Sequence, residues 1–178
     1  MKIVSWNCNG AFRKKYKKIL ELDADIYVIQ ECEPLNEIKG ELKKLISDGI
    51  WEKGANRKGV LVFAKPDVKL EKMEWDSFGM RVFIPIMIND SFPLIAVWTT
   101  KPAYIEEFYI WQLVNSGRIN EDVVIIGDFN SIITALIRAN GSHRYEFVGT
   151  EWLNPQGDSV IILSAKAVLL ERFSVFLF

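Results

Sequence analysis

The order of strand-like and helix-like segments constrains the fold of this chain most. Strand and helix patterns alternate as far as Gly49, give way to strand-like segments in succession, and then alternate again. The successive segments are Val60–Ala64, Lys69–Trp75, Arg81–Ile88 and Phe92–Trp98. Short turns of Gly, Pro, Asn and Asp join them, a pattern that predicts an antiparallel meander. The mixture favours a layered α+β or α/β sandwich over a helical bundle or a doubly wound nucleotide fold.

The segments on either side of this region supply the helices and the remaining strands. An amphipathic helix is expected around Phe12–Leu20, because its apolar residues recur at helical spacing and its lysines lie mostly on the other face. The other expected strands are Lys2–Trp6, Asp25–Gln30 and Val123–Ile126, and the other expected helices are Glu37–Ser47, Ile105–Val114 and, less regularly patterned, Ile132–Ala139.

Composition narrows the class of protein without naming a substrate. The 178 residues suit a single domain, and a net charge of −1 from 22 basic and 23 acidic side chains gives no general attraction to nucleic acid. Any such attraction must therefore come from a local patch. No apolar run approaches the roughly 20 residues of a membrane helix, and two cysteines, Cys8 and Cys32, make no disulfide framework. We expect a cytoplasmic monomer with buried, reduced thiols and no membrane contact.

Polar side chains follow three of the expected strands directly. Asn7 follows the first, Glu31 the second, and Asp128 and Asn130 the third. Side chains just beyond buried strands sit on rigid supports at the rim of a sheet, where ligands are commonly bound. A hard cation such as Mg²⁺ takes oxygen donors, often one or two carboxylates, and keeps its other positions for water and substrate phosphate. Glu31 and Asp128, with the amides of Asn7 and Asn130, would supply that set.

Each of these residues also has a purely structural interpretation. An asparagine after a strand is commonly a turn or cap residue, Glu31 is compatible with a solvated loop charge, and Asp128-Phe129-Asn130 is compatible with an ordinary turn. The prediction of a site depends on all three segments occurring together, in this order and on these elements.

The three segments resemble the signature of the endonuclease/exonuclease/phosphatase family, which includes exonuclease III-like and DNase I-like enzymes. Met1–Gly10 is similar to the family's opening strand, Asp25–Glu31 to its second motif and Val124–Ser131 to its central motif. The resemblance implies one domain over residues 1–178, matched over 1–131, with a two-sheet β-sandwich flanked by helices and a divalent metal, Mg²⁺ or Mn²⁺, at its rim.

Carried over position by position, the resemblance also implies roles. Glu31 would be the main metal ligand with Asn7 beside it, and Asp128 would orient or deprotonate the attacking water. Asn130 would hold the phosphate or Asp128 in place, so that Asn7 and Asn130 would also contact the substrate. Trp98 lies roughly where relatives often have a phosphate-contacting tyrosine; an indole lacks the hydroxyl, so Trp98 is expected in the core.

The sequence departs from the family in its last part. The family closes with a Ser-Asp-His motif, which is absent here, and the sole histidine, His143, comes too soon after the central motif to replace it. We therefore expect His143 to be a surface or locally hydrogen-bonded residue, and the tail, residues 132–178, to be truncated or altered. Losing a positioned acid–base group costs about 10²–10⁴ in rate, so weak or lost activity is expected.

Three functions stay open. The first is a Mg²⁺-dependent phosphodiesterase or endonuclease whose substrate is a phosphodiester such as DNA. The second is a non-catalytic remnant that binds metal, nucleic acid or protein, and the third is an incomplete chain with no function of its own. The basic run from Arg13 to Lys18 suits either a phosphate backbone or a solvated helix face.

Overall fold

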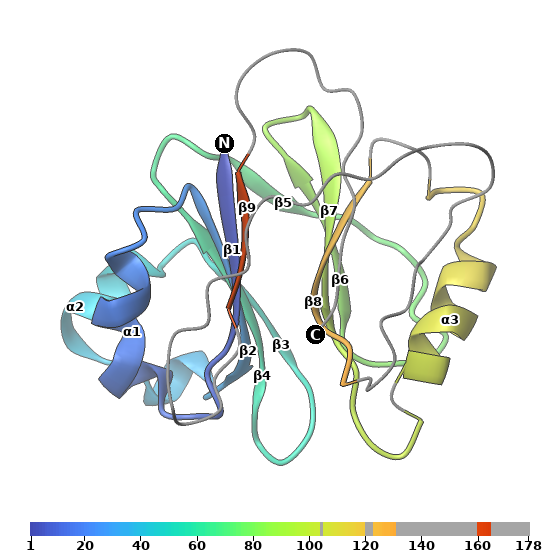
Figure 1. Ribbon diagram of the computed structural model, residues 1–178, viewed down its shortest axis with the longest axis horizontal. Helices are drawn as coiled ribbons and strands as arrows, with labels where there is room; N and C mark the ends of the chain where they lie inside the picture. Colours follow the sequence, from blue (N-terminus) through green and yellow to red (C-terminus); the bar gives the residue numbers. More distant parts are fainter. Residues whose placement is uncertain (104, 120–122, 131–159, 165–178) are drawn as a thin grey trace.

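In the computed structural model two β-sheets pack face to face, and helices cover the outer face of each (Figure 1). The structure describes residues 1–103, 105–119, 123–130 and 160–164. The helix expected at Ile132–Ala139 and the histidine at position 143 lie outside these residues. Within the described residues, no helix is long and apolar enough to cross a membrane.

The first sheet is built around a parallel pair of strands. Its order is β3-β4-β2-β1-β9, with β1 (Lys2–Asn7), β2 (Ile26–Cys32), β3 (Ile50–Lys53), β4 (Gly59–Ala64) and β9 (Val160–Ser164). β1 and β2 are parallel and joined through helix α1 (Phe12–Leu20), while the other pairs are antiparallel. A 3₁₀ turn (Leu35–Glu37) and helix α2 (Gly40–Leu45) link β2 to β3 and lie with α1 on the outer face (Figure 1).

The second sheet also contains one parallel pair of strands, at its edge. Its order is β5-β6-β7-β8, with β5 (Leu70–Lys72), β6 (Phe83–Ile88), β7 (Phe92–Trp98) and β8 (Val124–Asp128). β5, β6 and β7 form an antiparallel meander, and β8 returns parallel to β7 through helix α3 (Ile105–Val114). Each sheet therefore contains one strand–helix–strand unit that directs two strand ends toward the same edge.

The core has three layers because residues on each strand alternate between the two faces of its sheet. The central layer lies between the sheets and includes Ile3 and Val28 from the first and Ile86 and Leu94 from the second. One outer layer packs the first sheet against α1 and α2, and the other packs the second sheet against α3, where Trp111 is 1% exposed. Trp98 is buried in the central layer, as predicted.

The predicted fold class is confirmed: the chain forms a two-sheet sandwich flanked by helices. Three details differ from the prediction. Val60–Ala64 does not belong to the meander, since β4 pairs with β2 and β3 in the first sheet, and the strand Ile50–Lys53 was not predicted. The expected helix Glu37–Ser47 is interrupted because Ile38 is extended and turns its side chain into the core.

Gly127 gives a test of the close approach between β7 and β8. A Cβ atom at this position would lie 1.9 Å from the backbone oxygen of Val97, so any side chain pushes the two strands apart. Overpacking typically costs about 1–3 kcal/mol, and we expect Gly127→Ala to lower the free energy of unfolding by at least this amount. Urea denaturation followed by circular dichroism measures the loss.

Gly117→Ala is the matched control for this change. A Cβ atom at Gly117 would meet no atom within 4 Å, so its substitution should leave the urea midpoint nearly unchanged. Equal stability of Gly127→Ala and wild type would contradict the described β7–β8 pairing.

Candidate active site

The carboxyl ends of four strands meet at one rim of the sandwich. In the first sheet the parallel register places Asn7 at the end of β1 beside Gln30 of β2, and in the second it places Trp98 of β7 beside Asp128 of β8. The two ends touch across the gap between the sheets, because the Asn7 Nδ2 and Asp128 Oδ2 atoms are 2.6 Å apart. The rim therefore joins segments that are far apart in sequence.

Strand alternation explains why Asn7 and Asp128 face one another. Ile3 of β1 lies in the layer between the sheets, and so do Val124 and Ile126 of β8. Counting in steps of two along each strand puts Asn7 and Asp128 on these same inner faces, at the strand ends that border the apolar core. The apolar residues thus fix the positions of two polar side chains at the rim.

Glu31 reaches the rim by a different route, because β2 is irregular there. Val28 faces the other sheet and Ile29 faces the helices, but Cys32 also faces the helices, where regular alternation from Ile29 would turn it inward. The strand register shifts between Ile29 and Cys32, and Glu31 has a left-handed backbone with φ of 58°. A β-bulge of this kind re-aims a side chain, and such strained residues often occur at functional sites.

The amide of Asn7 bridges the two carboxylates. Its Nδ2 atom donates to Glu31 Oε1 at 3.2 Å and to Asp128 Oδ2 at 2.6 Å. Its Oδ1 atom accepts a hydrogen bond from the backbone N–H of Asn9 at 3.0 Å, which fixes which end of the amide faces the acids. Asn7, Glu31 and Asp128 are therefore brought together as one constellation.

Asn130 lies next to this constellation and supports Asp128 through its backbone. Its N–H donates to Asp128 Oδ1 at 2.9 Å, and its side-chain Nδ2 donates to the Thr99 carbonyl oxygen at 2.7 Å, at the end of β7. Burial raises the pKa of Asp128 and the charge of Glu31 adds to this, while the hydrogen bonds from Asn130 and Asn7 oppose it. Asp128 is thus a carboxyl group with an increased tendency to hold a proton.

Lys58 is a further residue of the site, and sequence reasoning missed it. It belongs to the loop between β3 and β4, and its Nζ atom lies 2.5 Å from Glu31 Oε2. The side chains of Lys58 and Glu31 are 33% and 20% exposed, so the ion pair is only partly shielded from water. No sequence motif indicates a role for Lys58, because a lysine in a hairpin loop is an ordinary surface residue.

The donor atoms at the rim fit a hard cation. Mg²⁺ is commonly held by only one or two protein carboxylates and completes its shell with water and phosphate, and Glu31 and Asp128 are two such groups. No cluster of three or more His, Cys, Asp or Glu side chains with metal-binding geometry occurs among the described residues. The Asn7 oxygen faces Asn9, so this amide must turn over before it can act as a metal ligand.

Helix α1 begins beside the site and is capped by Glu33, the residue that follows β2. Its N-cap residue, Ala11, has no side chain to satisfy the first backbone N–H groups. Glu33 does so instead, accepting from the N–H of Phe12 at 2.7 Å and of Arg13 at 2.9 Å, and pairing with the Arg13 guanidinium at 3.0 Å. Burial raises the pKa of Glu33, but these hydrogen bonds outweigh it and the net pKa is lowered.

The other residues singled out in the sequence have structural surroundings. Cys8 and Cys32 are fully buried free thiols, as predicted, and burial raises the pKa of Cys8 to about 12. Within the basic run, Arg13 contacts Glu33 and Lys15 donates to the Cys8 carbonyl oxygen at 2.7 Å. Lys17 is exposed on α1, so both interpretations of the run stay open.

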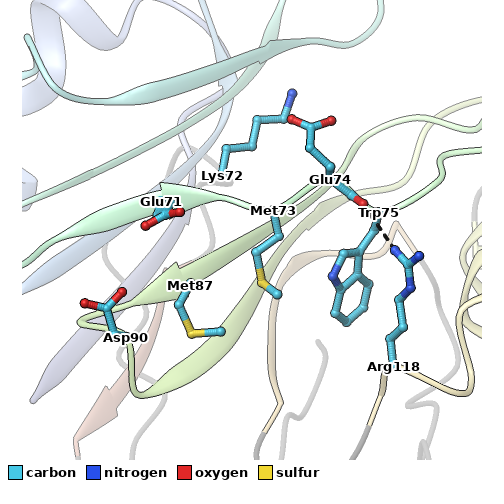
Figure 2. A pocket seen from close by; sticks show the side chains of 8 residues that line it. All are labelled: Glu71, Lys72, Met73, Glu74, Trp75, Met87, Asp90 and Arg118. Atoms are coloured by element: carbon cyan, nitrogen blue, oxygen red, sulfur yellow. Dashed lines mark hydrogen bonds between the residues drawn. The ribbon is translucent and has the colours of Figure 1, made fainter.

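An open hollow lies elsewhere, on the second sheet beside β5 (Figure 2). Met73, Met87 and Trp75 line it, with the Arg118 guanidinium 6.0 Å from the centre of the Trp75 ring. Its acidic residues Glu71 and Asp90 pair with Lys69 at 3.1 and 2.9 Å. Both carboxylates are exposed and share one lysine as an ion-pair partner, whereas the rim between the sheets joins polar side chains from both sheets. The rim therefore remains the better candidate for chemistry.

No protein-family model matches this sequence, and no curated protein matches it. Solved structures do match the fold. An AP endonuclease from Archaeoglobus fulgidus has a TM-score of 0.50 and 17% identity, over 73% of this chain and 57% of that one. A humanized TDP2 from D. rerio has a TM-score of 0.49 and 18% identity, over 74% and 62%. The 3′ phosphatase NExo from Neisseria, bound to a product DNA hairpin, has a TM-score of 0.48 and 20% identity, over 73% and 58%.

The likeness to the AP endonuclease concerns the fold. The described part of the chain has a DNase I-like two-sheet sandwich, the fold that the sequence resemblance implied. The chain spans less than two thirds of the length of each of these solved structures. At such low identity the likeness extends to the fold alone.

Glu33→Gln tests the cap of helix α1. The amide keeps one acceptor but turns an NH₂ group toward a donor, so we expect a loss of about 1.5–3 kcal/mol in the free energy of unfolding, as for hydrogen bonds to charged groups. Because the folded pKa of Glu33 is lowered, its contribution is complete above the ordinary carboxyl pKa and is lost as pH falls through the lowered value. The gap between wild type and variant should therefore narrow on acidification, measured by urea denaturation at neutral and acidic pH.

Glu37→Gln is the control, because Glu37 forms an exposed pair with Arg57 at 2.9 Å. Such pairs contribute about 0–1 kcal/mol. If Glu33→Gln were as mild as Glu37→Gln at neutral pH, Glu33 would not be the cap of α1.

Proposed function

We infer that the chain is a member of the endonuclease/exonuclease/phosphatase superfamily, and we propose that its rim site binds Mg²⁺ or Mn²⁺ and hydrolyses phosphoesters. The observation that carries this proposal is the bridge made by Asn7 between Glu31 of one sheet and Asp128 of the other. Two carboxylates and an amide so close together, at the strand ends of this fold, supply oxygen donors for a hard cation and polar groups for a phosphate.

In this proposal Glu31 is the main cation ligand, with Asn7 beside it. The bound cation would neutralise charge that develops on the phosphoryl and leaving oxygens. Glu31 is suited to the role because the bulge in β2 holds its carboxylate at the rim, away from the helices. Asn7 is the last residue of the buried strand β1, so its position is fixed by strand pairing and packing.

Asp128 acts on the attacking water. Its raised pKa, caused first by burial, makes it a better proton acceptor than an ordinary aspartate. The backbone N–H of Asn130 holds one oxygen of Asp128 and leaves the carboxylate oriented toward the rim. Once substrate is bound, the amides of Asn7 and Asn130 donate N–H groups to the phosphate oxygens and so hold the phosphate in position.

A phosphodiester, with DNA as the first class to test, is the proposed substrate. The solved structure at a TM-score of 0.50 is named an AP endonuclease, which is the reason for beginning with DNA. The shared motifs address the phosphate and not the group attached to it, so small phosphodiesters belong in the same panel. We propose further that the protein acts as a monomer and without a membrane.

A non-catalytic domain that binds metal or nucleic acid is the second candidate. It is favoured by the absence of a closing Ser-Asp-His motif from the sequence, in which His143 is the sole histidine. The third candidate, an incomplete chain without function, predicts that the protein unfolds without cooperativity. A single sharp thermal transition would count against that third candidate.

Cleavage assays with purified protein separate the first two candidates. We expect Mn²⁺- or Mg²⁺-stimulated cleavage of an oligonucleotide or a small phosphodiester, removed by a chelator and lowered at least about 10²-fold by Glu31→Ala and by Asp128→Asn. Glu37→Ala, which removes an exposed carboxylate elsewhere, is the control and should leave the rate unchanged.

Absence of metal-stimulated cleavage across the panel would rule out the hydrolase. Binding of Mn²⁺ or of an oligonucleotide without turnover would then support the non-catalytic domain, and cleavage that is lost in Asp128→Asn would exclude it.

A further inference from the structure

The loop that carries Lys58 is held in place by its own backbone. The N–H of Gly54 donates to the Lys58 carbonyl oxygen at 2.8 Å, and the N–H of Lys58 donates to the Ala55 carbonyl oxygen at 2.9 Å. The stem of Lys58 then runs past Gly10, where a Cβ atom would lie 3.4 Å from Lys58 Cε. The ammonium group is therefore delivered to Glu31 from a defined anchor, across the turn that follows β1.

Lys58 and Asn7 each contact a different oxygen of the Glu31 carboxylate. The Lys58 ammonium holds Oε2 at 2.5 Å, and the Asn7 amide holds Oε1 at 3.2 Å. Asp128 has no ion pair with a cationic side chain among the described residues, and its two oxygens accept from Asn7 and Asn130. Of the two rim carboxylates, Glu31 is thus the one that already carries a positive partner.

The geometry points to Lys58 as a tethered cation that occupies the place of the metal on Glu31, so that a divalent cation binds by displacing it. This inference rests on the proposed metal site and adds a feature of this chain to it. A ligand that must break an existing ion pair binds more weakly by the free energy of that pair, so Lys58 lowers the apparent metal affinity. The ion pair is partly exposed, which leaves water and ions a path to Glu31.

Displacement also gives Lys58 a second position. Its anchor in the loop stays fixed, so the released ammonium group remains at the rim, next to the bound cation. A phosphate group of the substrate is the anion that would attract it there. Lys58 is in this sense a positioning residue, which pairs with Glu31 when metal is absent and with the substrate phosphate when metal is bound.

Binding of Mn²⁺, followed by electron paramagnetic resonance, tests the inference without any turnover. We expect Lys58→Met to bind Mn²⁺ at least about fivefold more tightly than wild type. Lys58→Arg keeps the positive charge and should bind close to wild type, which separates the charge from the shape of the side chain. Lys53→Met removes an exposed lysine from the neighbouring strand β3 and should have no effect. Lys58→Gln replaces Lys58→Met if the latter does not fold.

Each outcome has a defined meaning. Equal or weaker Mn²⁺ binding by Lys58→Met, or tighter binding by Lys53→Met to the same degree, overturns the role of Lys58 and leaves the metal site standing. Binding only after Lys58 is removed supports the inference in its strongest form. Failure of wild type and all Lys58 variants to bind Mn²⁺ at millimolar concentration instead refutes the proposed metal site. Glu31→Ala must abolish the binding, since retention would place the ion elsewhere.

Discussion

The hydrogen bonds of a single amide, that of Asn7, connect the two halves of the candidate site. They reach one carboxylate in the same sheet and one in the opposite sheet, at 3.2 and 2.6 Å. The connection depends on the two strand–helix–strand units, which direct β1 and β2 of one sheet and β7 and β8 of the other toward a common rim. If the apolar layer between the sheets were packed in another register, alternation would turn Asn7 and Asp128 away from one another.

The rim concentrates negative charge, and its surroundings compensate for this in three ways. The Asn7 amide and the Asn130 backbone N–H donate to the acids, the Lys58 ammonium pairs with Glu31, and Asp128 has a raised pKa. Two carboxylates held close together lower the stability of the fold but favour the binding of a cation. Such a conflict between stability and function is often seen at functional sites. The backbone of Glu31, with φ of 58°, adds strain at the same place.

Much of this architecture could be predicted from local sequence patterns. The buried strands, the polar residues at their ends and the sandwich fold follow from alternation and from the order of segments. Glu31 was also expected at the rim, but the bulge that directs it there was not, because a bulge is a property of strand pairing and not of the residues alone. Lys58 was missed for a related reason: its hairpin was assigned to the wrong sheet, so nothing connected it with β2. The cap of α1 could not be predicted either, because Glu33 lies after β2 and far from the start of the helix in sequence.

The pairing of β1 with β9 has a consequence for how this chain is made. β9 contributes residues 160–164, and it pairs antiparallel with β1 from Lys2 to Trp6. Until those late residues leave the ribosome, the edge of β1 that they cover offers its backbone N–H and C=O groups to any passing strand. The first of the described strands is therefore among the last of them to be completed. Slow, non-local closure of this kind prolongs exposure to aggregation, and chaperones that shield strand edges would act at this step.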